Sequence, residues 1–296
     1  MARIVIIGNG KIGNAIAEIL RSKKNEIAFW DSMPEKAQGQ LPLSETIPVA
    51  DFVFLCVPSF AVPDAACVIK PYLLRRTVVI SVSKGIEKES GETMDELLSR
   101  ILPRRPFALL SGPMLAVELS SDMGGAAVIA SKNAAVRNVV ARLFKGTELR
   151  ITTSADIHGV ACAGILKNIY AIIIGAAEGM GSGYNTKGFL LGQAQSEIMG
   201  LIPLLGGARE TASIPALMGD LFATSLSPSS NNHSFGVAIA RNSMHTGFAE
   251  GAATLPFVAK RLGKRARRFP LFMITQEFIK HPDEGKKKFK KFLFGK

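Results

Sequence analysis

Residues 2–20 read ARIVIIGNGKIGNAIAEIL, and this stretch decides the fold of the N-terminal half. A run of isoleucine and valine, typical of a buried strand, ends in a glycine-rich segment and passes directly into a helical pattern. Gly8 permits a tight turn, Gly10 lets the backbone approach a pyrophosphate, and Gly13 lets the helix pack against the strand. The helix N-terminus offers unpaired amides to phosphates. The pattern therefore predicts a dinucleotide site formed by Gly8, Asn9, Gly10, Lys11, Ile12 and Gly13.

A second strand, expected at Glu26–Trp30, is followed by Asp31, which lies 18 residues after Gly13. A carboxylate at this place accepts hydrogen bonds from the adenosine ribose and repels the 2′-phosphate of NADP, so Asp31 favours NAD as the cofactor. Lys36, five residues on, keeps NADP open. The alternative is a simple strand–helix turn in another α/β fold.

Strand and helix signals continue to alternate as far as Thr153 and then give way to helices alone. This order predicts a doubly wound parallel sheet of the Rossmann type in residues 1–153, followed by an all-helical domain in residues 154–296. Further strands are expected at 52–57, 77–83, 107–110, 126–130 and 149–151, and helices at 61–70, 91–101, 114–120, 133–144, 156–180, 188–206, 209–216, 233–245 and 251–262.

The stretch between Asp31 and Asp51 is unusually short. Only 19 residues separate the two positions, which is barely enough for one crossover between parallel strands. We therefore expect the usual third, edge strand to be short or missing, with any remnant near Leu41–Ser44.

The charge and the cysteines restrict the class of protein. The net charge is +12, but residues 260–296 alone hold 13 Lys/Arg against three acidic residues, so the body is nearly neutral and no nucleic-acid partner is expected. Cys56, Cys67 and Cys162 form no paired motif and are predicted to be reduced, buried thiols, with no metal site. The first strand begins almost at Met1, which leaves no room for a signal peptide and favours a cytoplasmic protein.

Residues 159–177 are almost entirely apolar yet carry Lys167 and Asn168 at their centre. The segment has nearly the length of a membrane span, about 20 residues. A lysine at the bilayer centre is costly and no second span would shelter it, so a buried helix is the better interpretation. Lys167 either points out of this helix or is held inside for chemistry, because an unpaired buried lysine is avoided.

Several motifs, in this order, resemble those of the NAD-dependent glycerol-3-phosphate dehydrogenases. They are the glycine segment GNGKIG, VSKGIE at 82–87, SGPMLAVE at 111–118, GILKN at 164–168, Gly219–Leu221 with Thr224, SNNHSFG at 230–236, and AEG at 249–251. The resemblance covers roughly residues 3 to 262. It implies interconversion of glycerol 3-phosphate and dihydroxyacetone phosphate with NAD, an oxidoreductase reaction of glycerophospholipid metabolism.

The resemblance assigns roles to individual residues. Lys167 would be the acid/base group at the substrate carbinol, with Lys84 as a second cation and Asp220 as the group that orients Lys167. Reduction of a ketone leaves an alkoxide, so a positioned acid must supply a proton, and burial tunes an amine for this task. The implied substrate-binding set is Lys84, Gly112, Lys167, Asp220, Thr224, Ser230, Asn231 and Asn232. Beyond the glycine segment and Asp31, the implied cofactor-binding residues are Lys84, Ala116, Asn231 and Glu250.

The sequence departs from the family pattern at the phosphate-binding segment. There the family normally has serine-arginine-asparagine-arginine, whereas this chain has Ser230, Asn231, Asn232 and His233. An arginine offers a charged bidentate fork to a phosphate, and an asparagine offers one weak neutral donor group. Met114 also replaces a serine found in many bacterial members. Two alternatives therefore stay open: a dehydrogenase of another small hydroxy compound, and a non-catalytic dinucleotide-binding regulatory protein.

Two partners are expected. One is a small-molecule substrate, which would be a phosphorylated triose, and the other is a second copy of the chain in a homodimer. The tail, EGKKKFKKFLFGK at 284–296, interleaves lysines with phenylalanines. Such a pattern suits weak contact with an anionic membrane. The alternative is a mobile, solvated end whose phenylalanines fold back on the helical domain.

Overall fold

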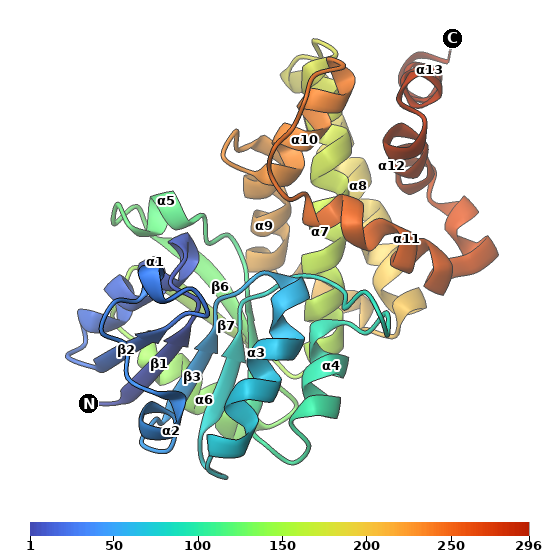
Figure 1. Ribbon diagram of the computed structural model, residues 1–296. Helices are drawn as coiled ribbons and strands as arrows, with labels where there is room; N and C mark the ends of the chain where they lie inside the picture. The colour runs from blue at the N-terminus through green and yellow to red at the C-terminus, as the bar shows by residue number, and fades with distance from the viewer. Residues whose placement is uncertain (296) are drawn as a thin grey trace. The chain divides into compact units, whose positions relative to one another are not determined.

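The computed structural model describes residues 1–295, so Lys296, one of the tail lysines, lies outside the described residues. Contacts within the chain divide it into two compact units, Met1–Ala161 and Cys162–Lys296. We call them the sheet unit and the helical unit (Figure 1). The domain boundary at 153/154 stays a prediction.

The sheet unit is built on seven strands within the described residues. In the sheet they lie in the order β2-β1-β3-β4-β5-β6-β7. Their bounds are β1 (Arg3–Ile7), β2 (Glu26–Trp30), β3 (Phe52–Leu55), β4 (Val78–Ser81), β5 (Phe107–Ser111), β6 (Gly125–Ala130) and β7 (Leu149–Ser154). The predicted fold class, a Rossmann-type sheet followed by a helical region, is confirmed.

One pair of strands differs from the expected parallel arrangement. β6 runs antiparallel to β5, with Leu110 paired to Ile129. A parallel connection must run back along the sheet and usually needs a full crossover helix. Between these two strands the chain has only the four-residue helix α5 (Ala116–Leu119), so it turns back instead.

The usual edge strand is missing from the sheet, as the short stretch after Asp31 predicted. β2 forms the edge, and Leu41–Ser44 holds no strand; the four-residue helix α2 (Leu43–Thr46) begins there. Because β2 and β3 leave β1 on opposite sides, the order reverses at β1. The carboxyl end of β1, where the glycine segment begins, is therefore the place where such sheets bind ligands.

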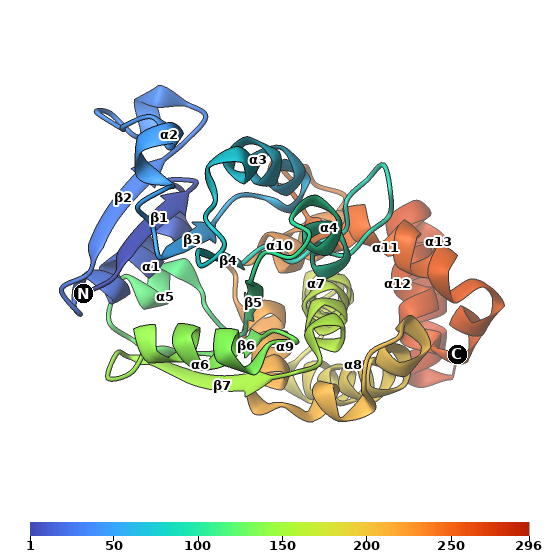
Figure 2. The same cartoon turned by 90° about the horizontal axis from the view of Figure 1, so that it is seen from below.

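Helices cover both faces of the sheet. Figure 2 shows α3 and α4 on one face and α1, α5 and α6 on the other. Their bounds are α1 (Lys11–Arg21), α3 (Val62–Ile69), α4 (Met94–Ile101) and α6 (Ala134–Leu143). A core of buried side chains, including Ile6, Ile16, Phe54 and Phe144, joins α1 and α6 to the strands. This packing fixes the glycine segment between a rigid strand and a rigid helix.

The helical unit continues from α7, which begins in the sheet unit. Its helices are α7 (Ile157–Gly179), α8 (Tyr184–Leu205), α9 (Pro215–Leu226), α10 (Asn231–Ala240), α11 (Glu250–Leu262), α12 (Pro270–Lys280) and α13 (Pro282–Phe294). The helix expected at 209–216 is wrong. A short 3₁₀ segment, Arg209–Ser213, stands there, and α9 begins at Pro215 because proline favours the first turn of a helix.

Helix α7 is the one described helix long and apolar enough to cross a membrane. Its apolar window is entirely buried inside the protein, as in a core helix. α10 approaches it very closely, since a Cβ at Gly236 would overlap the carbonyl oxygen of Ile172, and one at Gly175 would overlap that of His233. These glycines bring the start of α10 against the middle of α7, where Lys167 and Asn168 lie.

The tail is helical, which the sequence interpretation did not predict. Gly285 and Phe289 of α13 are buried, and a Cβ at Gly285 would overlap the backbone of Phe278 in α12. Phe289 is 1% exposed, so one phenylalanine does fold back on the helical unit. The alternative of phenylalanines that fold back on the helical unit therefore holds for Phe289.

The cysteines follow the expectation only in part. All three are free thiols, and Cys56 and Cys162 are buried, but Cys67 is exposed on α3. The expectation of a buried thiol at Cys67 is therefore wrong. Burial raises the pKa of the Cys56 thiol to about 12, which keeps it protonated and unreactive.

Candidate active site

The glycine segment has the geometry that its sequence predicts. Gly8 has a φ of +101°, and a Cβ there would lie 2.7 Å from the carbonyl oxygen of Cys56. A Cβ at Gly13 would overlap the carbonyl oxygen of Gly8, so only glycine permits this contact between helix and strand. Gly10, by contrast, faces open space, and α1 begins after it without a side-chain cap. The backbone N–H groups of the first turn of α1, including those of Lys11 and Ile12, are therefore available to bind phosphate oxygens.

Asp31 is fixed beside the glycine segment. Its carboxylate accepts hydrogen bonds from the backbone N–H of Asn9 at 2.9 Å and of Met33 at 3.0 Å. The side chain of Gln40 accepts a hydrogen bond from the backbone N–H of Asp31 and donates one to its carbonyl oxygen. The side-chain amide of Asn9 donates to the carbonyl oxygen of Lys36. A carboxylate has about four lone-pair sites, so two remain for ribose hydroxyls. Asp31 is thus oriented for the role that the sequence predicts.

A cavity of about 190 Å³ opens next to Asp31. Apolar side chains, including Val57 and Ala65, form much of its wall, and Gly8 and Asp64 also line it. The carboxyl ends of β1, β2 and β3 meet here, so the cavity suits an adenosine group. The sequence interpretation missed Asp64 and Val57. Their place after the third strand, at the edge where this fold binds ligands, was the available signal.

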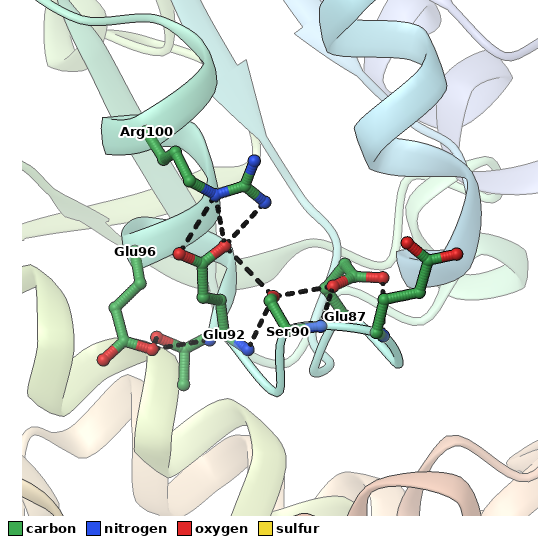
Figure 3. A network of polar contacts seen from close by, with 7 residues as sticks. Glu87, Ser90, Glu92, Glu96 and Arg100 are labelled. Atoms are coloured by element: carbon green, nitrogen blue, oxygen red, sulfur yellow. Dashed lines mark hydrogen bonds and ion pairs between the residues drawn. The ribbon is translucent and has the colours of Figure 1, made fainter.

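Lys84 lies in the loop after β4, and a polar network around Glu87, Ser90 and Glu92 forms farther along the same loop (Figure 3). The Glu87 carboxylate accepts hydrogen bonds from the N–H and the hydroxyl of Ser90, and Glu92 accepts from Arg100 at 2.8 Å. Partial burial raises the pKa of Glu87, but the hydrogen bonds from Ser90 outweigh it, so the pKa lies below its usual value. The Lys84 ammonium donates to the carbonyl of Gly112 at 3.0 Å.

Lys167 is buried in the middle of α7, with 8% of its surface exposed. Its Nζ donates to Thr224 Oγ1 at 2.6 Å and lies 3.1 Å from Asp220 Oδ1. Thr224 in turn donates to Asp220 at 3.2 Å. Asp220 and Thr224 stand four residues apart on α9 and so share one helix face. Lys167 therefore points inward to a matched acceptor pair, and the alternative of an outward-pointing lysine is wrong.

Next to Lys167, a chain of amides joins three helices. The Asn232 side chain donates to Asn168 Oδ1 at 3.0 Å and accepts from the backbone N–H of Gly251 at 2.8 Å. Asn168 and Asn232 are both buried. Asn232 therefore connects α7, α10 and the start of α11, and its amide is used within the protein. Glu250, the first residue of α11, stands beside this junction.

The segment that departs from the family pattern forms the N-terminus of α10. Ser230 is the N-cap and accepts from the N–H of His233, while Asn231 is exposed. Burial lowers the pKa of His233, although Glu178 opposes this, so the imidazole is neutral at neutral pH. His233 therefore offers no positive charge to an anion there. In the sheet unit, Ala116 of the implied cofactor set begins α5.

Within each unit, the structure brings most of the predicted residues together. In the sheet unit the glycine segment and Asp31 form one site, and Lys84 contacts Gly112. In the helical unit Lys167, Asp220 and Thr224 form one hydrogen-bonded group. Among the described residues, no hydrogen bond joins Asn231 to that group. The Asn231 side chain lies instead close to Gly247, where an added Cβ would be 2.8 Å from its Oδ1. The assignment of these sets to catalysis stays a prediction.

Two family models match this chain. The one described as NAD-dependent glycerol-3-phosphate dehydrogenase N-terminus matches residues 32–137, and the one described as the C-terminus of the same enzyme matches residues 156–288. Together they cover more than half of the chain. The glycine segment precedes the first match, so its assignment rests on its own geometry.

Curated relatives and a solved structure agree with these matches. A glycerol-3-phosphate dehydrogenase [NAD(P)+] of Clostridium tetani is 33% identical over 260 residues, which are 80% of this chain and 74% of the relative. A relative of the same name from Agrobacterium fabrum is 32% identical over 287 residues, 88% of each chain. The crystal structure of glycerol-3-phosphate dehydrogenase from Coxiella burnetii has a TM-score of 0.88, 25% identity and 99% coverage of both chains. The family that the motifs indicated is confirmed: the chain belongs to the NAD-dependent glycerol-3-phosphate dehydrogenase family.

Proposed function

We propose that this protein is an oxidoreductase that interconverts glycerol 3-phosphate and dihydroxyacetone phosphate. The observation that carries the proposal is the buried ammonium of Lys167, held by Asp220 and Thr224 in a chain of this family. A protein that only bound a dinucleotide would have no need of a buried lysine, which is costly to keep. The non-catalytic alternative is therefore the weaker one.

The residues of the sheet unit fit a nicotinamide dinucleotide. Gly10 leaves open space before the uncapped start of α1, and Asp31 borders a cavity of about 190 Å³. The glycine segment would hold the pyrophosphate, and Asp31 would bind the adenosine ribose. When bound, the cofactor supplies the hydride for reduction and accepts it in oxidation.

Lys167 would hold and move the proton. In reduction, the substrate carbonyl oxygen gains negative charge and Lys167 Nζ donates a proton to it; in oxidation the same atom takes the proton back. Asp220 would keep Nζ directed and balance its charge, and Thr224 would fix the geometry of the pair. Lys84 would donate a further hydrogen bond to the substrate, with Gly112 setting its direction.

The proposed substrate can be tested with a panel of carbonyl compounds. Oxidation of NADH is followed with dihydroxyacetone phosphate, unphosphorylated dihydroxyacetone and small 2-keto acids. Dihydroxyacetone phosphate should give the largest kcat/KM. If an unphosphorylated compound is preferred instead, the protein is a dehydrogenase of another small hydroxy compound, and the proposal fails.

Asn231→Arg should strengthen the binding of dihydroxyacetone phosphate. An arginine at the start of α10 adds charged hydrogen bonds, worth about 1.5–3 kcal/mol each, so KM should fall by about tenfold or more. The measurement is KM for this substrate in the two proteins. Asn231→Gln, which adds length without charge, should leave KM unchanged. A higher KM in the arginine variant would show that another group already occupies the phosphate position.

NADH should be preferred to NADPH by about tenfold or more in kcat/KM, because the carboxylate of Asp31 would face the 2′-phosphate. The relatives are named NAD(P)+ and leave this choice open. Asp31→Ser should narrow the difference, whereas Asp64→Asn, a change at the other carboxylate of the same cavity, should not. A wild-type preference for NADPH under matched conditions would refute the role of Asp31.

Two further expectations about partners and place stay proposals. We expect a homodimer, for which light scattering after size-exclusion chromatography is the direct measurement. We expect a cytoplasmic protein, because the described residues show a core helix rather than an exposed apolar span. Contact of the C-terminal tail with anionic membranes is a separate proposal, which rests on the surface of the helical unit.

A further inference from the structure

A group of aromatic and basic side chains is exposed on the helical unit. Phe189 of α8 is 54% exposed, and Phe294 of α13 is 64% exposed. We define the aromatic–basic patch by the following residues. It comprises Phe189, Phe294, Lys290 and Lys291, which are exposed, and the half-buried Phe292. Large apolar side chains exposed together usually mark a surface that binds something.

The two helices of the patch are in contact. The rings of Phe189 and Phe292 lie 6.1 Å apart at an interplanar angle of 38°, which joins α8 to the last turn of α13. Figure 1 shows α13 at the C-terminal end of the chain, packed beside α12. The phenylalanines of the tail therefore extend an aromatic surface that α8 begins.

The orientation of α13 directs its last lysines to solvent. Gly285 and Phe289 face α12, so Lys290, Lys291 and Phe294 lie on the exposed side of the helix. The lysines earlier in α13 are engaged: Lys287 pairs with Glu284 at 2.8 Å, and Lys288 pairs with Glu277 at 3.0 Å. Lys290 and Lys291 make no ion pair within the part of the chain that is described.

The charge around the patch has one sign. Residues 260–296 hold 13 Lys/Arg and only three acidic residues, and all three acidic residues pair with lysines of α13. The remaining positive charge suits an anionic partner. A compact helix end that combines exposed phenylalanines with unpaired lysines matches the boundary of an anionic bilayer, where rings enter the headgroup layer and lysines meet phosphates.

We propose that the aromatic–basic patch binds the surface of an anionic lipid bilayer. Phe189 and Phe294 enter the headgroup boundary, and Lys290 and Lys291 lie on the lipid phosphates. The contact is reversible, because one helix end buries little apolar area. It goes beyond the proposed dehydrogenase activity and does not depend on it.

The test uses the full-length protein and sedimentation with vesicles of phosphatidylcholine, with or without phosphatidylglycerol, at low ionic strength. The protein should bind only the anionic vesicles and should dissociate as salt screens the lysines. The variant Lys290→Glu/Lys291→Glu should lower the partition coefficient by at least about 25-fold, since each lysine contributes about five-fold. Phe294→Ser should also weaken binding.

The matched control is Lys23→Glu/Lys24→Glu, which changes the net charge equally at exposed lysines outside the patch. It should bind vesicles as the wild type does, and all variants should keep wild-type turnover in the absence of vesicles. Equal binding by the patch and control variants would refute the proposal. So would binding to heparin or RNA in place of vesicles, or a change of oligomeric state in Phe189→Ser, which would make the patch an interface between copies.

Discussion

Replacing Lys167 with alanine is expected to lower turnover by about 10²–10⁴-fold, the usual contribution of a positioned general acid. The side chain is buried, and its Nζ contacts Asp220 at 3.1 Å and Thr224 at 2.6 Å, so its position is fixed. Because Lys167 is not among the predicted cofactor-binding residues, the dissociation constant of NADH should hardly change. Steady-state kinetics and NADH fluorescence titration measure the two effects separately.

Two controls make the Lys167 result specific. Lys260→Ala, at an exposed lysine, should keep full turnover. A small primary amine added to the Lys167→Ala variant should restore part of the lost rate if the missing group is an acid. Near-normal turnover of Lys167→Ala would show that the lysine is structural, and the proposed mechanism would then be wrong.

The second large effect is expected at Glu197, a buried carboxylate of α8 that is 4% exposed. It accepts hydrogen bonds from the backbone N–H groups of Leu271 and Phe272, at 2.8 and 2.9 Å, and from the hydroxyl of Tyr170 at 2.7 Å. It therefore caps the start of α12, where Pro270 begins the helix without a side-chain cap of its own. Burial, followed by the nearby carboxylate, raises the pKa of Tyr170 well above its usual value, so the phenol stays a donor.

Glu197→Ala should reduce the free energy of unfolding by about 3–5 kcal/mol. It leaves several buried donors without a partner, at about 1–3 kcal/mol each, and removes packed volume. Thermal or urea unfolding, followed by circular dichroism, measures the loss. Glu284→Ala, at an exposed carboxylate, is the matched control and should leave the unfolding midpoint unchanged. A Glu197 variant as stable as the control would refute the capping role.

Local patterns in the sequence predicted the sheet unit well. The isoleucine and valine runs identify buried strands without reference to distant residues, and Gly8 ends the first of them. The 19-residue spacing between Asp31 and Asp51 excluded a full third strand on length alone. The antiparallel β6 was not predicted, because strand direction depends on how far the α5 connection reaches, and no local pattern records that distance.

The helical unit was predicted less completely for two physical reasons. In α13 only Gly285 and Phe289, four residues apart, are buried. The many lysines around them leave no apolar periodicity from which a packed helix could be predicted. The N-terminus of α12 is capped by Glu197, more than seventy residues earlier in the chain, and such a partner cannot be read from the sequence around Pro270. Lys167 could be identified from the sequence because a buried ammonium is costly unless it is paired, so a lysine within an apolar run indicates a specific role. Thr224 and Asp220 were identified only by the resemblance to the family.

The central claim is that this protein transfers a hydride between a nicotinamide cofactor and the C2 carbon of the phosphorylated triose. The most direct test incubates the protein with dihydroxyacetone phosphate and NADH deuterated at one or the other C4 position, and analyses the product by mass spectrometry. The account predicts glycerol 3-phosphate with one deuterium at C2 from one of the two labelled cofactors, and about 10²-fold less of this product or lower from Lys167→Ala in the same time. Absence of labelled glycerol 3-phosphate from both cofactors would contradict it.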